Sequence, residues 1–212
     1  TCKVLVVCGS PVVASANLLR RLAGECDHIV AVDRGLDALL GAGLGCDVYV
    51  GDADTVSEAG RALVDAAEDF EVERHDPYKD YTDLALALDS VRRRWPGAEA
   101  VATCATGGRP DMALSVLGLL ASYADAPVWI AEDETTARIL HGGESWTIEG
   151  AEGKTFSIIA VAPNTEVSEH GLEWGLDHSP LGLLADTGIS NVVRGTAKIQ
   201  VHTGTAIAYL YK

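Results

Sequence analysis

The chain has 212 residues, of which 48% are hydrophobic, so it can bury a sizeable core as one large domain or two small ones. Sixteen basic residues against 31 acidic ones give a formal net charge of −15. Because nucleic acids and anionic lipid surfaces bind cationic patches, this balance argues against both as partners. If the substrate is itself an anion such as a nucleotide, a divalent cation held by carboxylates is the expected bridge.

Features that would direct the chain out of the cytoplasm are not expected. No apolar run approaches the about 20 residues of a membrane span, and the N-terminal apolar stretch stops at Gly9, unlike that of a secretory signal. The five cysteines, an odd number without a C-x-x-C pair, predict reduced and buried thiols. We therefore expect a soluble cytoplasmic protein.

Residues 1–134 alternate short apolar runs with helical patterns. The expected strands are residues 4–8, 28–32, 47–50, 70–74, 98–104 and 128–131. The expected helices are residues 16–23, 36–40, 57–67, 82–94 and 111–123. Strands joined by helices predict an α/β domain with a parallel sheet and helices on both faces.

Residues 135–212 have a different texture, with short strands and glycine-containing turns. The expected strands are residues 145–149, 155–161, 166–169, 191–194, 196–202 and 205–211. This pattern predicts an all-β sandwich or barrel. Residues 132–143, which are polar and end in two glycines, are expected to be a linker.

Candidate functional residues gather in the loops that follow the predicted parallel strands. In such sheets ligands bind beyond the carboxyl ends of the strands. This rule selects the loops at Gly9, Asp33 and Asp52 and those at residues 76–83 and 106–111, four of which are rich in aspartate.

The loop Gly51-Asp52-Ala53-Asp54 follows the third strand. Side chains two residues apart in extended chain point the same way, so Asp52 and Asp54 could grip one hard cation. The alternative is an acidic turn whose side chains cap the next helix.

The segment Lys79-Asp80-Tyr81-Thr82-Asp83 precedes a predicted helix. Thr82 can cap that helix, and Asp83 suits its first turn. Capping does not explain Lys79 and Asp80, which stand where a helix start can receive phosphate oxygens.

The segment 106–111 joins a strand to a helix. Gly107 and Gly108 let the backbone approach a ligand closely, and Pro110 fits the first helical position. Arg109 could hold a phosphate through two hydrogen bonds, although a solvated arginine in an ordinary turn is the alternative. The chain has no G-x-x-x-x-G-K-[ST], so an ATP site here is not a P-loop.

Taken together, these segments resemble the thiamine pyrophosphokinase family. That family has an A-D-G-G-A-N turn, a G-D-F-D-S loop, a K-D-x-T-D helix start and a G-G-R-x-D-H turn, followed by G-L-x-W and S-N elements. The matching segments here are residues 32–37, 51–55, 79–83, 107–112, 171–174 and 190–191. The chain departs from the family at Arg34, Asp37, Ala53, Thr55 and Met112.

The resemblance implies an enzyme that uses ATP and Mg²⁺ to pyrophosphorylate thiamine, as a homodimer with its active site between subunits. Asp52, Asp54 and Asp83 would hold Mg²⁺, and together with Arg109 they would be the catalytic residues. The residues implied for ATP and its phosphates are Lys79, Asp80, Thr82, Gly107, Gly108, Arg109 and Asp111. Those implied for thiamine are Asp33, Trp174, Ser190 and Asn191. The thiamine hydroxyl group would attack the β-phosphorus, AMP would leave, and Asp54 or Asp83 would accept the proton.

Three other functions compete with this one. The residues Asp52-Ala53-Asp54-Thr55-Val56 also fit the D-x-D-x-[TV] loop of haloacid-dehalogenase-like phosphatases, but that loop normally follows the first strand. A degenerate member that senses thiamine diphosphate or a nucleotide would accommodate the changes at Arg34 and Met112. A purely protein-binding role leaves the aspartate-rich loops unexplained. Histidine pairs such as His170 and His178 lack metal-ligand spacing and are expected to be ordinary surface or core residues.

Overall fold

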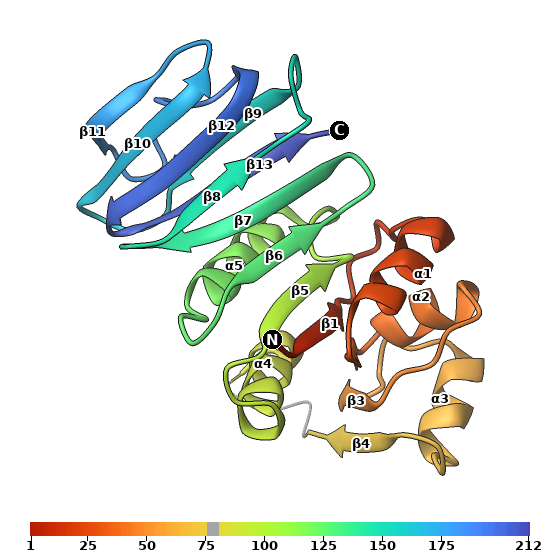
Figure 1. Cartoon of the computed structure of the whole chain (residues 1–212). Coiled ribbons are helices and arrows are strands. Elements are labelled where there is room, and N and C mark those ends of the chain that lie inside the picture. Colours follow the sequence, from red (N-terminus) through yellow and green to blue (C-terminus); the bar gives the residue numbers. More distant parts are fainter. Residues whose placement is uncertain (76–80) are drawn as a thin grey trace. The chain divides into compact units, whose positions relative to one another are not determined.

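The chain forms two compact units, Thr1–Leu119 and Leu120–Lys212, in a computed structural model that describes residues 1–75 and 81–212 (Figure 1). The first unit contains a parallel sheet with helices, and the second is built mainly from antiparallel strands. The predicted combination of a parallel sheet with helices and a set of antiparallel strands is therefore confirmed. No helix within the described ranges has the length and apolar character needed to cross a membrane.

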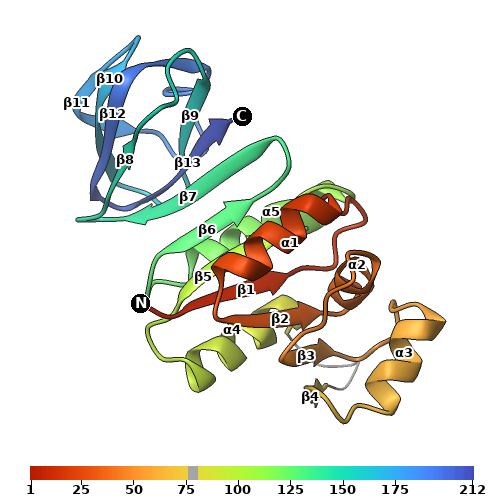
Figure 2. The same cartoon turned by 45° about the vertical axis from the view of Figure 1, so that its right-hand side comes forward.

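The parallel strands of the first unit lie in the order β5-β1-β2-β3-β4 (Figure 2). Their bounds are β1 (Lys3–Val7), β2 (His28–Val32), β3 (Val48–Gly51), β4 (Glu71–Arg74) and β5 (Glu99–Thr103). Residues 4–7 of β1 are all fully buried, so both faces of this strand are shielded from solvent. An unbroken apolar run is what a buried parallel strand requires.

Three of the five helices that follow these strands begin at side-chain caps. They are α1 (Ala16–Glu25), α2 (Gly35–Gly41), α3 (Glu58–Asp65), α4 (Asp83–Arg94) and α5 (Pro110–Ala121). The hydroxyl groups of Ser15, Ser57 and Thr82 accept backbone N–H groups at the starts of α1, α3 and α4. Each predicted strand and helix of residues 1–131 is present, with ends shifted by at most two residues.

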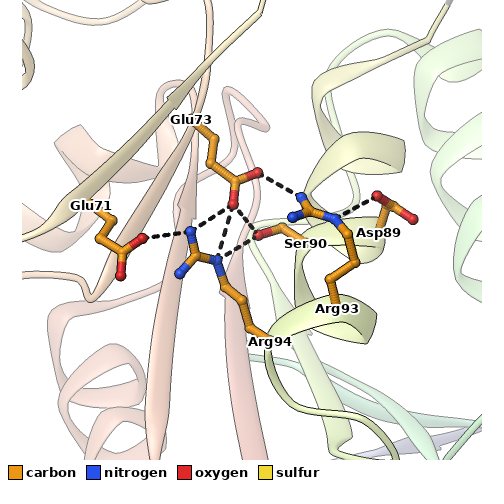
Figure 3. A network of polar contacts seen from close by, with 6 residues as sticks. All are labelled: Glu71, Glu73, Asp89, Ser90, Arg93 and Arg94. Atoms are coloured by element: carbon orange, nitrogen blue, oxygen red, sulfur yellow. Dashed lines mark hydrogen bonds and ion pairs between the residues drawn. The ribbon is translucent and has the colours of Figure 1, made fainter.

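A polar network joins β4 to α4 (Figure 3). Arg94 Nη2 lies 2.8 Å from Glu73 Oε1 and 2.6 Å from Glu71 Oε2, and Ser90 Oγ donates to Glu73 Oε1 at 2.7 Å. Burial, the largest single influence on the pKa of Glu73, would raise it, but the hydrogen bonds from Ser90 and Arg94 and the charges of Arg93 and Arg94 together lower the pKa. The network holds the helix that begins with Asp83 against the edge strand.

The second unit is a curved antiparallel sheet with the strand order β11-β10-β12-β9-β13-β7-β6, and β8 also pairs with β12 (Figure 2). The strands are β6 (Val128–Ala131), β7 (Thr135–His141), β8 (Ser145–Ile148), β9 (Thr155–Ala160), β10 (Thr165–Leu172), β11 (Leu176–Leu181), β12 (Asn191–Thr203) and β13 (Thr205–Tyr211). Its core is apolar, with Phe156, Ile158, Val193 and Ile199 fully buried.

The linker prediction for residues 132–143 is wrong. Most of this segment is β7, which pairs with both β6 and β13. Its buried Ala137 and Ile139 alternate with the partly exposed Arg138, a period-2 pattern that its polar composition concealed. The glycines Gly142 and Gly143 form the turn into β8.

Two further strand predictions need correction. The expected strands at 191–194 and 196–202 are one strand, β12, because Gly195 continues it with a φ of 102° instead of ending it. Strand β11 was not expected, since it is polar and contains Pro180. It lies at the edge of the sheet, where proline and polar residues are tolerated.

Candidate active site

Three aspartates from three elements meet at the carboxyl edge of the parallel sheet. Asp33 follows β2, Asp52 follows β3, and Asp83 is the first residue of α4. Each offers a carboxylate oxygen, and the three oxygens lie within 4.8 Å of one another on half-buried side chains. Carboxylate oxygens at this spacing suit a hard divalent cation.

Gly51 creates the space that the Asp33 carboxylate occupies. A Cβ atom at position 51 would lie 2.0 Å from Asp33 Oδ1, closer than any real contact. Asp33 itself has a φ of 45°, its N–H donates to Val50 O at 3.1 Å, and Tyr49 Oη donates to its Oδ1 at 3.3 Å. The backbone strain at Asp33 therefore serves to direct its carboxylate to the cluster.

The electrostatics of the cluster favour binding of a cation. Burial raises the pKa of Asp33 to about 8, assisted by a hydrogen bond with Asp83 and by the charges of Asp83 and Asp52, while the bond from Tyr49 acts in the opposite direction. These residues fit a divalent ion, because a positive charge between the carboxylates would offset the burial and the repulsion that together raise the pKa of Asp33.

Asp54 lies beside the cluster of Asp33, Asp52 and Asp83, but its carboxylate is not part of that group. Its N–H donates to Asp52 Oδ1 at 3.0 Å, and its own carboxyl group is exposed. A hydrogen bond between the two side chains raises the pKa of Asp54. The expected parallel alignment of Asp52 and Asp54 assumed extended chain, but Ala53 has a φ of 63° and turns the backbone between them.

Asp37, one of the departures from the family pattern, supports this loop. Its carboxylate accepts the N–H of Ser57 at 2.8 Å and also the Ser57 hydroxyl group. Ser57 caps α3, so the contact ties the first turn of α2 to the end of the Asp52 loop. Arg34, another departure, lines a pocket of about 310 Å³ together with Ser10 and Asp37.

The segment after β5 is close-packed against the loop after β1. Gly107 and Gly108 have φ values of 105° and 71°, and Cβ atoms there would lie 2.6 Å from Val12 and 2.5 Å from Pro11. Ser10 Oγ donates to the carbonyl oxygen of Thr106 at 2.9 Å. Glycine is thus required by neighbouring side chains of the same unit.

Arg109 stands on the surface with its charge already paired. Its guanidinium group makes two hydrogen bonds to Asp111, at 3.1 and 2.5 Å, and its side chain is 75% exposed. The bond from Arg109 lowers the pKa of Asp111. A phosphate at this position would compete with Asp111 for the guanidinium group.

Of the helix-start motif, only its last residues can be described. Thr82 Oγ1 accepts the N–H of Ala85 at 3.2 Å, so Thr82 is the predicted cap of α4. Lys79 and Asp80 lie outside the described residues.

In the second unit, Asn191 holds the turn that carries Trp174. The buried Asn191 side chain accepts the N–H of Trp174 at 3.1 Å and donates to its carbonyl oxygen at 2.7 Å. Trp174 as a residue is left 62% exposed. Ser190, with a φ of 58°, donates its N–H to Ser157 Oγ at 3.0 Å.

Two residues of these sites were not predicted. Glu169 is fully buried beside Asn191, its Oε2 accepts Asn191 Nδ2 at 3.5 Å, and burial raises its pKa to about 7. Tyr49, a buried strand residue, donates its hydroxyl group to Asp33. The sequence signal for both was weak, because the position of a polar side chain within a strand does not show which loop it will face.

Comparison with known proteins gives two family matches. The model described as thiamin pyrophosphokinase, catalytic domain, matches residues 19–131, and that described as thiamin pyrophosphokinase, vitamin B1 binding domain, matches residues 145–207. Comparison with curated proteins gave no match.

Several solved structures share the fold. Thiamin pyrophosphokinase from Geobacillus thermodenitrificans has a TM-score of 0.81 and 26% identity, covering 99% of this chain and 97% of that one. Thiamine pyrophosphokinase from Bacillus subtilis has a TM-score of 0.79 and 24% identity, covering 99% of both chains. The enzyme from Candida albicans has a TM-score of 0.81 and 14% identity, covering 99% of this chain and 89% of that one.

Proposed function

The chain belongs to the thiamin pyrophosphokinase family, and from this membership we infer that it is an ATP-dependent thiamine diphosphokinase. It transfers the pyrophosphoryl group of ATP to the hydroxyl group of thiamine and releases AMP. The observation that carries this conclusion is the match of both domain models, in order, over most of the chain.

We propose that residues 1–134 form the ATP-binding catalytic domain and residues 135–212 the thiamine-binding domain. The first matched region, residues 19–131, lies within the first proposed domain, and the second, residues 145–207, lies within the second. We propose too that helices cover both faces of the parallel sheet, which is supported by the complete burial of consecutive residues in β1.

We propose that Asp33, Asp52 and Asp83 hold Mg²⁺ at the edge of that sheet. The bound cation would supply positive charge against the phosphoryl oxygens of ATP. The protein's own part is to hold the carboxylates in place from three separate elements, so that little rearrangement is needed when the substrates bind. The fit of the three grouped oxygens to a hard cation supports this assignment.

Asp54 is our proposed acceptor of the proton from the thiamine hydroxyl group, with Asp83 as the alternative. Asp54 is exposed and adjoins the cluster through Asp52, so its carboxylate is available to accept a proton beside the bound cation. In this proposal Asp54 has a catalytic role, as expected from the sequence, but it does not bind the cation with Asp33, Asp52 and Asp83.

The residues proposed to contact ATP and its phosphates come from two loops. Thr82 and the neighbouring Lys79 and Asp80 precede α4, and Arg109 would exchange its bonds with Asp111 for bonds to phosphate. Gly107 and Gly108 let the loop after β5 run close to its neighbours. The exposure of Arg109 supports this exchange, because its side chain can turn without leaving a core.

Trp174 is proposed to be the main contact for thiamine in the second unit. An exposed indole offers a flat apolar face that also attracts a cationic ring such as thiazolium. Asn191 would position Trp174 through its two backbone hydrogen bonds, with Ser190 beside it. Asp33 would approach thiamine from the metal cluster.

We propose that the enzyme is a cytoplasmic homodimer. The dimer is supported by the surface of helix α5, where the apolar residues Met112 and Leu114 are 45% and 59% exposed. Exposed apolar side chains on one helix are typical of a surface that another protein covers.

The function is tested by incubating the protein with ATP, Mg²⁺ and thiamine and measuring AMP. We expect AMP to form only when thiamine is present. Orthophosphate release from phosphate esters would instead identify a phosphatase. Tight binding of thiamine diphosphate without turnover would identify a sensor, and either outcome would overturn the inference.

A further inference from the structure

A second group of potential metal ligands lies in the β-rich unit. Glu166, His178 and His202 offer ligand atoms that all lie within 4.8 Å of one another. They come from three adjacent strands, with β10 between β11 and β12. None of the three belongs to the proposed thiamine diphosphokinase site.

Irregular strand pairing brings both histidines to this position. Glu166 pairs with Thr203 and Val167 with Val201, so His202 is an extra residue in β12. On the other side, Val167 pairs with Ser179 and Glu169 with Leu176, so one residue of β10 is opposite two residues of β11, Asp177 and His178.

The backbone at His178 has a φ of 43°, so this residue adopts a conformation that side chains rarely take. Each neighbour of β10 therefore has a β-bulge at a histidine. Bulges re-aim side chains and are common at functional sites.

Within the cluster, potential ligand side chains contact one another, and Ser168 contacts both histidines. His178 Nδ1 lies 2.8 Å from Glu166 Oε1, and the two imidazole rings stack at 3.8 Å between centroids. The buried Ser168 accepts the N–H of His178 at 3.0 Å and lies 2.7 Å from His202 Nε2. A hydroxyl group that holds one nitrogen of an imidazole leaves the other nitrogen oriented toward a ligand position.

We propose that Glu166, His178 and His202 bind a divalent transition-metal ion of the zinc class. Two imidazole nitrogens and one carboxylate oxygen suit Zn²⁺, Ni²⁺ or Cu²⁺, whereas Mg²⁺ prefers oxygen ligands alone. Three protein ligands leave one position of a tetrahedral zinc site open for water. The Asp33, Asp52 and Asp83 cluster, made of carboxylates, therefore differs from this site in the ion it selects.

Binding requires one movement. An imidazole nitrogen binds a metal ion in the plane of its ring, so two parallel stacked rings cannot both reach one ion. The His178 side chain is 63% exposed and can turn out of the stack while Glu166 follows it. His202, held by Ser168, stays in place.

The test is a calorimetric titration of the full chain with Zn²⁺ at neutral pH, with Mg²⁺ in excess to occupy the carboxylate cluster. We expect one Zn²⁺ ion per chain, with an affinity that falls about tenfold or more in His178→Ala and in His202→Ala. The matched control is His170→Ala, which removes an exposed histidine of β10 outside the cluster and should leave the affinity unchanged.

A spectroscopic readout identifies the ligands directly. Co²⁺ in place of Zn²⁺ should give visible absorption bands of a low-coordinate site in the wild type and in His170→Ala, but not in the other two variants. If a histidine variant does not fold, as judged by circular dichroism, Glu166→Gln takes its place. Saturable Zn²⁺ binding that persists in these variants, or no saturable binding by the wild type, would overturn the proposal.

Discussion

The carboxyl group of Asp33 combines a strained backbone, close packing and a perturbed charge. It fits against Gly51, accepts a hydrogen bond from Tyr49 and shares the cluster with Asp52 and Asp83. Because its pKa is raised to about 8, mainly by burial, it is protonated at neutral pH while no cation is bound. If the cluster binds a cation as proposed, Asp33 would therefore couple cation binding to loss of a proton.

We predict that binding of Mg²⁺ to the protein releases close to one proton at neutral pH, and that its affinity rises with pH until about 8. The reason is that the cation requires the ionised form of Asp33, which is scarce below its pKa. Calorimetry in two buffers of different ionisation enthalpy measures the proton release. A Mg²⁺ affinity that does not change between pH 6 and 8 would contradict this coupling. Proton release on Mg²⁺ binding that persists in Asp33→Asn would contradict it too.

Trp174 tests the assignment of the thiamine site. We expect Trp174→Ala to raise the KM for thiamine about tenfold or more, because the exposed indole would no longer cover the substrate. The KM for ATP in the same variant is the internal control and should change little. Equal effects on both substrates would place Trp174 outside the thiamine pocket.

At the scale of elements, the contact between β4 and α4 matters because α4 begins with Asp83. Glu73 joins these elements through Arg93, Arg94 and Ser90, at distances between 2.7 and 3.1 Å (Figure 3). Its side chain is only 14% exposed. Removal of Glu73 should therefore cost more stability than removal of one member of a solvent-exposed ion pair.

We predict that Glu73→Ala lowers the free energy of unfolding by about 1 to 3 kcal/mol, since it leaves Arg94 and Ser90 without their shared acceptor. Urea denaturation measures the change. Asp89→Ala is the matched control, because it removes only an exposed partner of Arg93 and should cost less than about 0.5 kcal/mol. Equal losses in the two variants would show that the partly buried network adds nothing.

Helices and strands were predicted well where their periodicity was strong. Alternating apolar runs and helical patterns identified the elements up to residue 131, because buried parallel strands are almost entirely apolar. Strand β7 was missed because Arg138 and the threonines before it make the segment polar, although its inward residues are buried. Such a strand is specified by its pairing with β6 and β13, and a local sequence pattern does not show this pairing.

The site was predicted only in part. Asp33, Asp52 and Asp83 could be assigned to one edge of the sheet from their positions after strands. Which of them would meet depends on the turn at Ala53, whose φ of 63° is not encoded in a short motif. The bulges that bring His178 and His202 together depend on strand register, which sequence spacing does not reveal either.

For the whole molecule, charge and assembly are the relevant properties. A formal charge of −15 should favour the approach of a cationic substrate such as thiamine, while the negative charge of ATP makes the bound divalent cation necessary. The exposed apolar side chains of α5 are costly for a monomer, so a second copy is the expected cover.

We predict that the protein sediments as a dimer and that Leu114→Glu converts it to a monomer. A charge in the centre of an apolar interface cannot be solvated there, so the dimer is weakened by several kcal/mol. Leu63→Glu, which changes a 44% exposed leucine on α3, is the control and should leave the dimer intact. A Leu114→Glu variant that sediments like the wild type would contradict the assignment of α5 to the interface.

The most direct measurement is the rate of thiamine-dependent AMP formation in Asp33→Asn, Asp52→Asn and Asp83→Asn, with Asp89→Asn, an exposed change within α4, as the control. If these three carboxylates jointly hold the cation that ATP requires, each of the first three substitutions should lower kcat/KM by about a hundredfold or more while the fold is kept. The control should stay near the wild-type rate. Near-normal turnover in Asp52→Asn and Asp83→Asn would show that the cation is held elsewhere.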